Sequence, residues 1–431
     1  MSHLKIAFIG AGSYTFGPSM IKQAFVENRL DGIELALMDA RRESAELMAA
    51  LARKTAERVG VKATITATDR RDEALAGADF VICSVAVQGQ RRFEMDCDVV
   101  RRVCPAHIIT EFGGVAGISY SLRQIAMIEG LAADMKRLCP DAWLLNVANP
   151  LPRVCQAAHE RGVHTVGFCS ASSGVYNLAW MLLKGERLRY PWTAAKERWD
   201  VTMAGLNHFS WLLAMRERAT GEDILPRLRA RLDAGATTNN PRCEGIWRET
   251  GWLVLPYDGH CQDFLPPVGT EHSRTENFHG TAEERDARMA FLRRADEGQA
   301  SVEDLPGESW ERPMDLIAAL ALGRKAQFNS VNLVNDAQIP SLPRGVFVES
   351  PGEADAKGLR TPTLPLPDST LPYALSAAAV TDTIVRAALT RSRALVRRAV
   401  ELDPTVIDKR TGIAAMDALL SAHADVLPAY A

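Results

Sequence analysis

The stretch that decides the fold is Lys5-Ile6-Ala7-Phe8-Ile9-Gly10-Ala11-Gly12-Ser13. A mostly apolar run enters a Gly-x-Gly turn, and the sequence after it predicts a helix, which is how a dinucleotide-binding fold begins. Gly10 permits the tight turn, and Gly12 lets a pyrophosphate approach the backbone at the start of the helix. Thr15 replaces the usual third glycine, with Gly17 two residues later. The turn alone is therefore also compatible with an ordinary strand–turn–helix.

A second predicted strand, residues 32–39, ends in an acid at Asp39. A carboxylate there, about 20 residues beyond the glycine turn, is placed to bind the adenosine ribose hydroxyls. Asp39 therefore favours NAD over NADP, although Arg41 and Arg42 could accommodate a 2′-phosphate. The simpler alternative is a helix cap or a solvated carboxylate. Turn and acid together predict a nucleotide site.

Composition bounds the class of protein. The 431 residues predict one large domain or two moderate ones, and 47% hydrophobic residues suffice for a core. A net charge of −3 argues against nucleic-acid and anionic-membrane partners. No apolar run reaches the roughly 18 residues that a membrane span needs, and the first strand begins too early for a signal peptide. Eight cysteines without a CxxC motif are no disulfide framework, so we expect a cytoplasmic protein.

The first half of the chain alternates between strand and helix patterns. Further strands are predicted at residues 62–67, 75–85, 143–148 and 165–168, and a helix at 43–58. This alternation predicts a parallel, doubly wound sheet. Functional groups in such sheets gather at the carboxyl ends of the strands. Three polar segments stand at those positions: Gln88–Arg91, Asn149-Pro150 and Cys169-Ser170.

The second half changes character. Residues 199–215 alternate as a strand, residues 233–310 are rich in Gly, Pro and charge, and helices are predicted at 374–400, without a break, and at 413–427. Tyr190-Pro191-Trp192 interrupts the pattern of the first half. We therefore expect a Rossmann-like nucleotide domain at residues 1–195 and an α+β substrate and metal domain at residues 196–431.

Two parts of the sequence contain groups that could do chemistry. Cys169 ends a predicted strand, His208 lies in Gly-Leu-Asn-His-Phe-Ser-Trp, and a thiolate and an imidazole can share a divalent metal. The simpler interpretation is a buried cysteine and a core histidine. The second part, Asp258-Gly-His260-Cys-Gln-Asp263-Phe, packs two carboxylates and a histidine into one loop. From the residues alone, an ordinary solvated loop is the preferred explanation.

The chain as a whole resembles family 4 of the glycoside hydrolases, NAD-dependent glycosidases whose fold is related to malate and lactate dehydrogenases. The matching segments follow the family's order along nearly the whole chain. They are Gly10-Ala-Gly-Ser13 with Phe16; Leu37-Met-Asp39; Glu111 through Arg123; Asn149-Pro150; Gly167-Phe-Cys169; Gly205-Leu-Asn-His208 with Trp211; Asp258-x-His260-x-x-Asp263-Phe264, similar to a loop of the α-glycosidase branch; and Asn332 through Glu349.

Two positions depart from the family pattern. Ser170 stands where family members often have a His or Asp that is assigned as the acid, and a serine is a poor general acid at neutral pH. Val115-Ala116 stands where a proline is usual. These departures leave the acid for the leaving group without a candidate in the sequence.

The resemblance implies a glycosidase outside the usual two-carboxylate scheme. In the family's reaction, NAD⁺ takes a hydride from C3 of the sugar, a base removes the C2 proton, the C1 substituent is eliminated, water adds, and the hydride returns. The resemblance implies NAD and a divalent metal, with Mn²⁺ as the expected ion. It also implies a small-molecule glycoside as substrate and a homodimer or homotetramer.

The same resemblance assigns roles to individual residues. Cys169 and His208 would bind the metal, Asp258 would be the base with His260 and Asp263 in support, and Glu111 would orient His208 or a metal-bound water. Substrate contacts are expected from Asn149, Asp263 and Arg91. Gln88 and Arg92, in the same segment as Arg91, could also contact the substrate. Cofactor contacts are expected from Gly10, Gly12, Ser13, Phe16, Asp39 and Val87.

The substrate class and two other functions stay open. The Asp-x-His loop favours α-glycosides. An anionic group at C6 of the sugar could be bound by Arg91, Arg92 or Arg274. The alternative is that these are solvated surface arginines. A sugar or hydroxy-acid dehydrogenase is an alternative, since Asn149-Pro150 also fits malate dehydrogenase-like chains, but its catalytic His–Asp pair is not found. A non-catalytic NAD-binding regulator is motivated by Ser170 alone.

Overall fold

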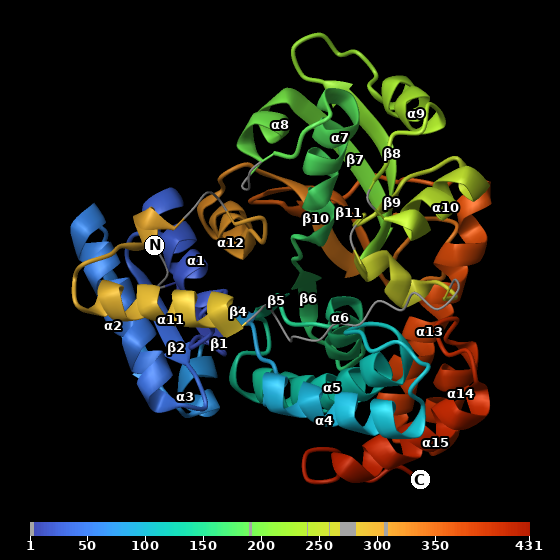
Figure 1. Ribbon diagram of the computed structural model, residues 1–431. Helices are drawn as coiled ribbons and strands as arrows, with labels where there is room; N and C mark the ends of the chain where they lie inside the picture. The colour runs from blue at the N-terminus through green and yellow to red at the C-terminus, as the bar shows by residue number, and fades with distance from the viewer. Residues whose placement is uncertain (1–3, 189–191, 239, 258, 268–281, 306–308) are drawn as a thin grey trace.

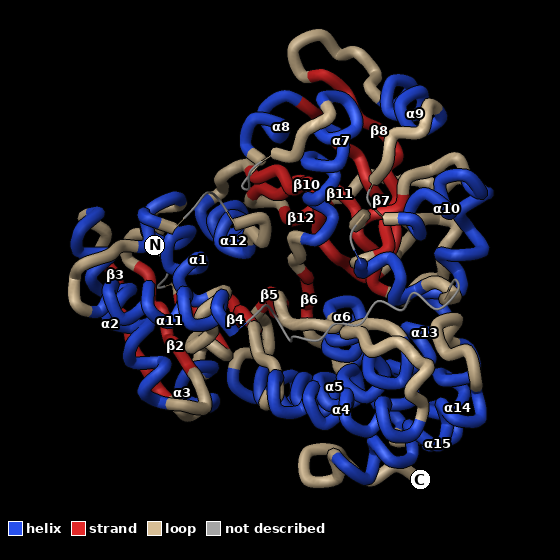
Figure 2. The backbone as a smooth tube through the Cα atoms, viewed as in Figure 1, coloured by secondary structure: helices blue, strands red, loops and turns tan. Residues whose placement is uncertain are grey.

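The computed structural model describes residues 4–188, 192–238, 240–257, 259–267, 282–305 and 309–431. Within these residues twelve strands form one sheet, in the order β3-β2-β1-β4-β5-β6-β10-β11-β7-β8-β9, with β12 paired to β11. Helices cover the sheet along its length (Figures 1 and 2).

The first six strands form the nucleotide-binding part of the sheet. All five pairings among them are parallel, and their order is that of a doubly wound dinucleotide-binding fold. The predicted parallel sheet is therefore confirmed. The strands are β1 (Lys5–Ile9), β2 (Ile33–Met38), β3 (Ala63–Thr68), β4 (Phe80–Cys83), β5 (Trp143–Asn146) and β6 (His164–Gly167).

Alternate residues of β1 show why this part is a three-layer fold. Ile6 and Phe8 belong to one apolar cluster, with the helices α1 (Gly17–Ile21), α2 (Arg42–Val59) and α12 (Pro313–Leu322). Ala7 and Ile9 belong to another, on the opposite face. Because successive side chains of a strand point to opposite faces, a strand buried on both sides reads as a continuous apolar run.

The opposite face is covered by helices from both ends of the chain. The cluster there joins α4 (Gly89–Val103), α5 (Gly114–Leu138) and α6 (Leu151–Glu160) to α13 (Leu371–Thr390), α14 (Arg393–Leu402) and α15 (Lys409–Ala422). Figure 1 shows these last three helices in red beside α4, α5 and α6. The C-terminal helices therefore complete the core of the nucleotide-binding part.

The prediction of one unbroken helix over residues 374–400 is wrong. Arg391 has a φ of +57°, in the left-handed region, and separates α13 from α14. The Ser392 hydroxyl then accepts a hydrogen bond from the N–H of Leu395 (3.3 Å) and caps α14. Serine is a strong N-cap residue, so the local signal for a new helix lay at Ser392.

The remaining strands extend the sheet in antiparallel fashion. β10 (Ala326–Val334) pairs with β6, β11 (Phe347–Asp355) with β10, and the hairpin β7 (Trp199–Leu206) and β8 (Phe209–Glu217) follows. The expected single strand at 199–215 is this hairpin. The two remaining strands are short: β9 (Val254–Leu255) and β12 (Gly358–Arg360).

The helices not yet named are α3 (Arg71–Leu75), α7 (Val175–Lys184), α8 (Thr193–Arg198), α9 (Leu225–Asp233), α10 (Pro241–Thr250) and α11 (Ala282–Asp296).

One row of paired residues crosses the whole sheet. It runs through Thr68, Met38, Ile9, Cys83, Asn146, Gly167, Asn332, Glu349, Gly205, Ser210 and Leu255. Several residues with predicted roles follow this row by one to three positions: Gly10, Gly12, Asp39, Asn149 and Cys169. The domain boundary at residue 195 falls within α8 and stays a prediction, because strands from both sides of it share the sheet.

Two general properties follow from the described residues. None of their helices is long and apolar enough to cross a membrane. All eight cysteines are free thiols.

Candidate active site

The glycine turn has the geometry expected of a nucleotide loop. Gly10 has a φ of +83°, which L side chains rarely adopt. The N–H of Gly12 donates to Oδ2 of Asp39 (3.0 Å). A Cβ on Gly12 would lie 2.7 Å from that oxygen and 2.5 Å from the Cβ of Ser44. The predicted acid therefore lies directly against the turn.

Gly17 takes over the packing role of the missing third glycine. It begins α1, and a Cβ there would lie 2.8 Å from the carbonyl oxygen of Ala11 and 2.9 Å from Sδ of Met48. The third glycine of the fingerprint serves close packing of helix and strand. The turn before it is closed by Ser13, whose hydroxyl accepts a hydrogen bond from the N–H of Phe16 (3.2 Å).

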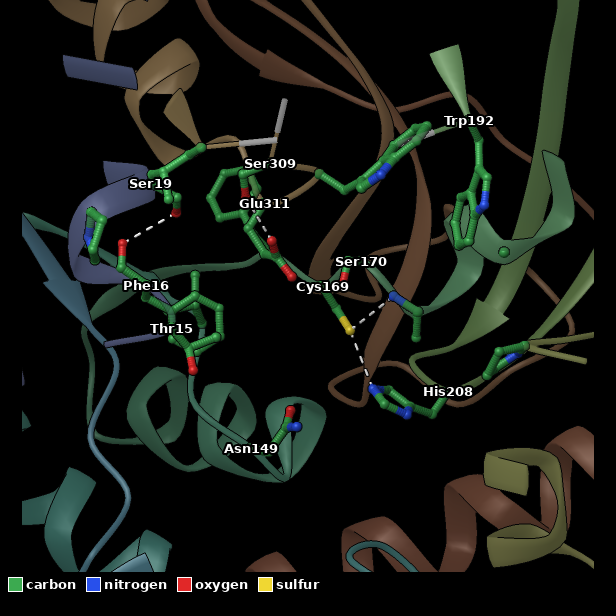
Figure 3. A pocket seen from close by; sticks show the side chains of 18 of the residues that line it. Thr15, Phe16, Ser19, Asn149, Cys169, Ser170, Trp192, His208, Ser309 and Glu311 are labelled. Carbon is green, nitrogen blue, oxygen red and sulfur yellow. Dashed lines mark hydrogen bonds between the residues drawn. The ribbon is translucent and has the colours of Figure 1, made fainter. Parts of the chain in front are cut away.

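Cys169 and His208 meet at the carboxyl end of β6. The Cys169 Sγ lies 3.2 Å from Nε2 of His208 and accepts a hydrogen bond from the N–H of Ala171 (3.4 Å). Figure 3 shows both side chains on one wall of a pocket. The predicted pair is brought together although 39 residues separate it along the chain.

The turn that carries His208 and the burial of the pair set their chemistry. Asn207 and His208 form the two-residue turn of the β7–β8 hairpin, and His208 has a φ of +63°, uncommon for a residue with a side chain. Burial, with a contribution from His260, lowers the pKa of His208 well below its usual value, so its imidazole is neutral. Burial, with the charge of Glu349, raises the pKa of the Cys169 thiol. A cation would be needed there to stabilise the thiolate.

The loop between α4 and α5 packs on the imidazole. The ring of Phe112 lies against that of His208, with centroids 4.2 Å apart. The N–H of Phe112 donates to Oδ2 of Asp263 (3.2 Å), and a Cβ on Gly113 would overlap the backbone of Asp263. The predicted Glu111 therefore lies one residue from the ring that covers His208.

The predicted Asp-x-His-x-x-Asp loop is placed in part. His260 lines the pocket, its ring centroid 4.6 Å from that of His208, and its Nδ1 lies 3.8 Å from Oδ2 of Asp263. Asp263 is buried, which raises its pKa, and it holds the loop of Phe112. Asp258 lies outside the described residues, as does Arg274.

Asn149, for which a sugar contact stays a prediction, lines the pocket. Its carbonyl oxygen accepts a hydrogen bond from the buried amide of Gln124 (3.1 Å). The same amide donates to the carbonyl of Val85 (2.7 Å), and its oxygen accepts from the N–H of Val87 (2.9 Å). Gln124 thus ties the segment of the predicted cofactor contact Val87 to Asn149, a link that the sequence did not indicate.

The two arginines after β4 lie in different surroundings. Arg91 is exposed on α4 and is not among the residues that line the pocket. Arg92 is buried, and its guanidinium donates two hydrogen bonds to the carboxylate of Asp425 (2.7 and 2.5 Å). Arg92 therefore binds the C-terminal segment, and the suggestion that it meets substrate is wrong.

The pocket has a volume of about 780 Å³ and extends from Cys169 and His208 to α1 and to the segment that precedes α12. Several of its residues were not predicted, because they come from segments without a motif: Lys22, Trp192, Tyr257, Arg288, Trp310 and Glu311. In Figure 3 the carboxylate of Glu311 lies between Phe16 and Cys169, and the Ser309 hydroxyl donates to it (2.8 Å).

The donors present fit a divalent ion that keeps open positions for substrate. Within the described residues no group of three or more His, Cys, Asp and Glu side chains could hold a metal. The thiol and the imidazole form a pair of protein ligands that faces the cavity. Such a pair leaves coordination sites for oxygens of a bound molecule, as a catalytic metal site requires.

Comparison with known sequences assigns the chain. The profile described as "Family 4 glycosyl hydrolase" matches residues 5–184, and that of the "Family 4 glycosyl hydrolase C-terminal domain" matches residues 203–406. The chain belongs to family 4 of the glycosyl hydrolases, as the order of its motifs indicated.

Two bacterial relatives cover nearly the whole chain. An alpha-galactosidase of Bacillus subtilis (strain 168) is 27% identical over 459 residues, 99% of each chain. An alpha-galacturonidase of the same organism is 24% identical over 436 residues, 94% of each chain.

Solved structures show the same fold. A 6-phospho-alpha-glucosidase from gut microorganisms, solved in complex with NAD and Mn²⁺, matches with a TM-score of 0.77 at 19% identity and covers 100% of each chain. The malate dehydrogenase of Plasmodium falciparum in complex with NADH matches with a TM-score of 0.52 at 14% identity, covering 91% of this chain and 99% of that one. The expected relation to malate dehydrogenases is confirmed at the level of the fold.

Proposed function

We propose that the chain is an NAD- and divalent-metal-dependent glycosidase that cleaves an α-glycoside by transient oxidation at C3 and elimination at C1. The observation that carries the proposal is the pair Cys169 and His208, 3.2 Å apart and facing the same pocket as the glycine-turn residue Phe16. Two members of the family named above are α-glycosidases.

Residues of this chain would hold the two groups. Gly12, which has no side chain, would allow close approach of a dinucleotide, and Asp39, hydrogen-bonded to Gly12, would bind the ribose. Cys169 and His208 would bind the cation, for which Mn²⁺ is our expectation. When bound, NAD⁺ supplies a hydride acceptor for C3, and the cation supplies a Lewis acid for the sugar oxygens.

The chain's own side chains would do the remaining work. The amide of Asn149 would bind sugar hydroxyls beside the ligand pair, and Asp258 would take the C2 proton with His260 next to it. We assign proton donation at the leaving oxygen to Glu311. Among the described residues that line the pocket, the carboxylates are Glu27 and Glu311, and Glu27 is paired with Arg312.

Two basic side chains of the pocket bear on the charge of the substrate. Lys22 and Arg288 line the pocket, and Arg288 donates to the Thr15 hydroxyl (2.7 Å). An anionic group at C6 would meet Arg288 or Lys22, because these line the pocket and Arg91 does not. We also propose a cytoplasmic homo-oligomer, a location in keeping with eight free thiols.

The test is hydrolysis of a panel of aryl α- and β-glycosides, with neutral, 6-phosphorylated and C6-acidic sugars. Activity should require both NAD⁺ and Mn²⁺, and products formed in D₂O should carry deuterium at C2. Aglycone release that persists after removal of both NAD⁺ and metal would contradict the proposal. One equivalent of NADH per alcohol, without bond cleavage, would favour a dehydrogenase.

A further inference from the structure

Glu349 is a buried carboxylate in the row of residues that crosses the sheet. It lies on β11, its side chain is 0% exposed, and its backbone pairs with Asn332 and Gly205. It does not line the pocket, so it does not reach a substrate there. A carboxylate buried at this depth is costly unless hydrogen bonds stabilise it.

Three serine hydroxyls surround this carboxylate. The hydroxyls of Ser172 and Ser210 donate to its Oε2, at 2.9 and 2.6 Å. The hydroxyl of Ser330 donates to the other oxygen, Oε1. Each serine comes from a different segment, since Ser172 follows β6, Ser210 lies on β8 and Ser330 on β10.

Two of these segments carry the metal-ligand pair. Ser172 follows Cys169 by three residues, within the short 3₁₀ turn Ala171–Gly174. Ser210 follows His208 by two residues, and its hydroxyl also lies 3.0 Å from the carbonyl of Leu206, which precedes the turn. One oxygen atom of Glu349 therefore contacts both segments.

We propose that Glu349 is a positioning residue for the metal site: through Oε2 it holds the segments of Cys169 and His208 at the separation at which both can bind one cation. The inference rests on the proposed function, because it takes the pair as metal ligands. Hydrogen bonds from Ser172 and Ser210 to the same oxygen hold both segments to one atom, which suits this task. Groups that orient metal ligands affect metal affinity although they do not touch the metal.

The experiment compares five variants by Mn²⁺ titration of the NAD-loaded protein without substrate. Glu349→Gln should weaken Mn²⁺ binding about 10- to 100-fold. Ser172→Ala and Ser210→Ala should each weaken it by a smaller factor, and the double variant by less than the product of the two, because they act through one oxygen. Ser330→Ala is the matched control and should change affinity less than about 2-fold, because β10 carries no ligand.

A second readout separates positioning from general destabilisation. With Co²⁺ as the probe, the thiolate-to-metal absorption should shift in Glu349→Gln and stay unchanged in Ser330→Ala, while NAD affinity is equal in both. Unchanged Mn²⁺ affinity in Glu349→Gln, or an equal loss in Ser330→Ala and Ser210→Ala, would overturn the inference. If Glu349→Gln fails to fold, the serine variants decide. Wild-type Mn²⁺ affinity that Cys169→Ala leaves unchanged would instead overturn the proposed metal site itself.

Discussion

The ring of Phe112 covers the imidazole of His208, with centroids 4.2 Å apart and planes inclined by 31°. Phe112 is fully buried, and its N–H is bound to Asp263 (3.2 Å). The next two residues are fixed as well, because Gly113 packs on the backbone of Asp263 and the N–H of Gly114 donates to Asp403 (2.9 Å). The orientation of one metal-ligand candidate thus depends on a loop that the C-terminal half of the chain fixes.

Replacing Phe112 tests this dependence. Phe112→Leu should lower Mn²⁺ affinity about 10-fold, since the imidazole loses the surface that orients it, and should cost about 1–2 kcal/mol of stability. Isothermal titration with Mn²⁺ and thermal unfolding would measure the two effects. Phe93→Leu, a buried phenylalanine on α4, should lose stability but keep its Mn²⁺ affinity. Equal Mn²⁺ affinity in the two variants would contradict the prediction.

Adding a methyl group to the nucleotide turn should weaken NAD binding. Gly12→Ala places a Cβ 2.7 Å from Oδ2 of Asp39, so the turn or the acid must move, and we expect at least a 10-fold loss of NAD affinity. Fluorescence titration with NADH would measure it. Gly245→Ala is the control, because a Cβ there has open space within 4 Å. Comparable losses in both variants would show that the turn is not the NAD site.

The assignment of Glu311 predicts a dependence on the leaving group. Glu311→Gln should reduce kcat/KM by about 100-fold for alkyl glycosides, whose leaving oxygen needs a proton. For 4-nitrophenyl glycosides, whose leaving group departs without one, the loss should stay below about 10-fold. Ser170→Ala, which alters another residue of the pocket, should change either substrate less than about 3-fold. An equal loss for both substrates in Glu311→Gln would refute the role as acid.

The contact of Arg92 with Asp425 predicts a dependence of stability on pH. The Arg92 guanidinium lowers the pKa of Asp425 to about 2, below the value of about 3.9 in an unfolded chain. Because the folded-state pKa is the lower one, the contribution is complete above about pH 5 and is lost as the pH falls from about 4 to about 2. Asp425→Asn should therefore lower the Tm at pH 7, and the difference from wild type should shrink at pH 3.

Thermal scans at pH 7, 5 and 3 would measure the effect of Asp425→Asn. Asp336→Asn is the control, because the pair of Asp336 with Arg344 is exposed (77% and 75%) and such pairs contribute little. A Tm difference for Asp425→Asn that grows toward low pH would contradict the prediction.

The sequence predicted the parts of the fold that depend on local patterns. β1, β4 and β5 are buried on both faces, so they read as apolar runs that local sequence reveals. The position of β10 and β11 between β6 and β7 was not predicted, because pairing between strands distant in sequence leaves no periodic signal. The break at Arg391 was missed because the residues around it favour a helix. The single local sign of a new helix is Ser392, which caps α14.

The same distinction between local patterns and tertiary packing applies to the residues of the candidate site. Cys169, His208, Asn149 and His260 were predicted because each lies in a short motif, and they meet in one pocket. Glu311 and Arg288 were not predicted. Glu311 precedes α12 and Arg288 lies on α11, and only tertiary packing brings them to the same pocket as the residues of α1. Arg91 and Arg92 both follow the strand β4, so the sequence does not distinguish them. Only the position of Asp425 shows that Arg92 binds the C-terminal segment.

The helices α13, α14 and α15 complete the core of the nucleotide-binding part, and this bears on biosynthesis. A ribosome adding roughly 5–20 residues per second needs on the order of 10–45 s to pass from residue 195 to the end of α15. During that interval the part of α5 that contacts α13, α14 and α15 lacks those helices. The first 195 residues should therefore be less resistant to protease while the chain is being made than in the complete protein.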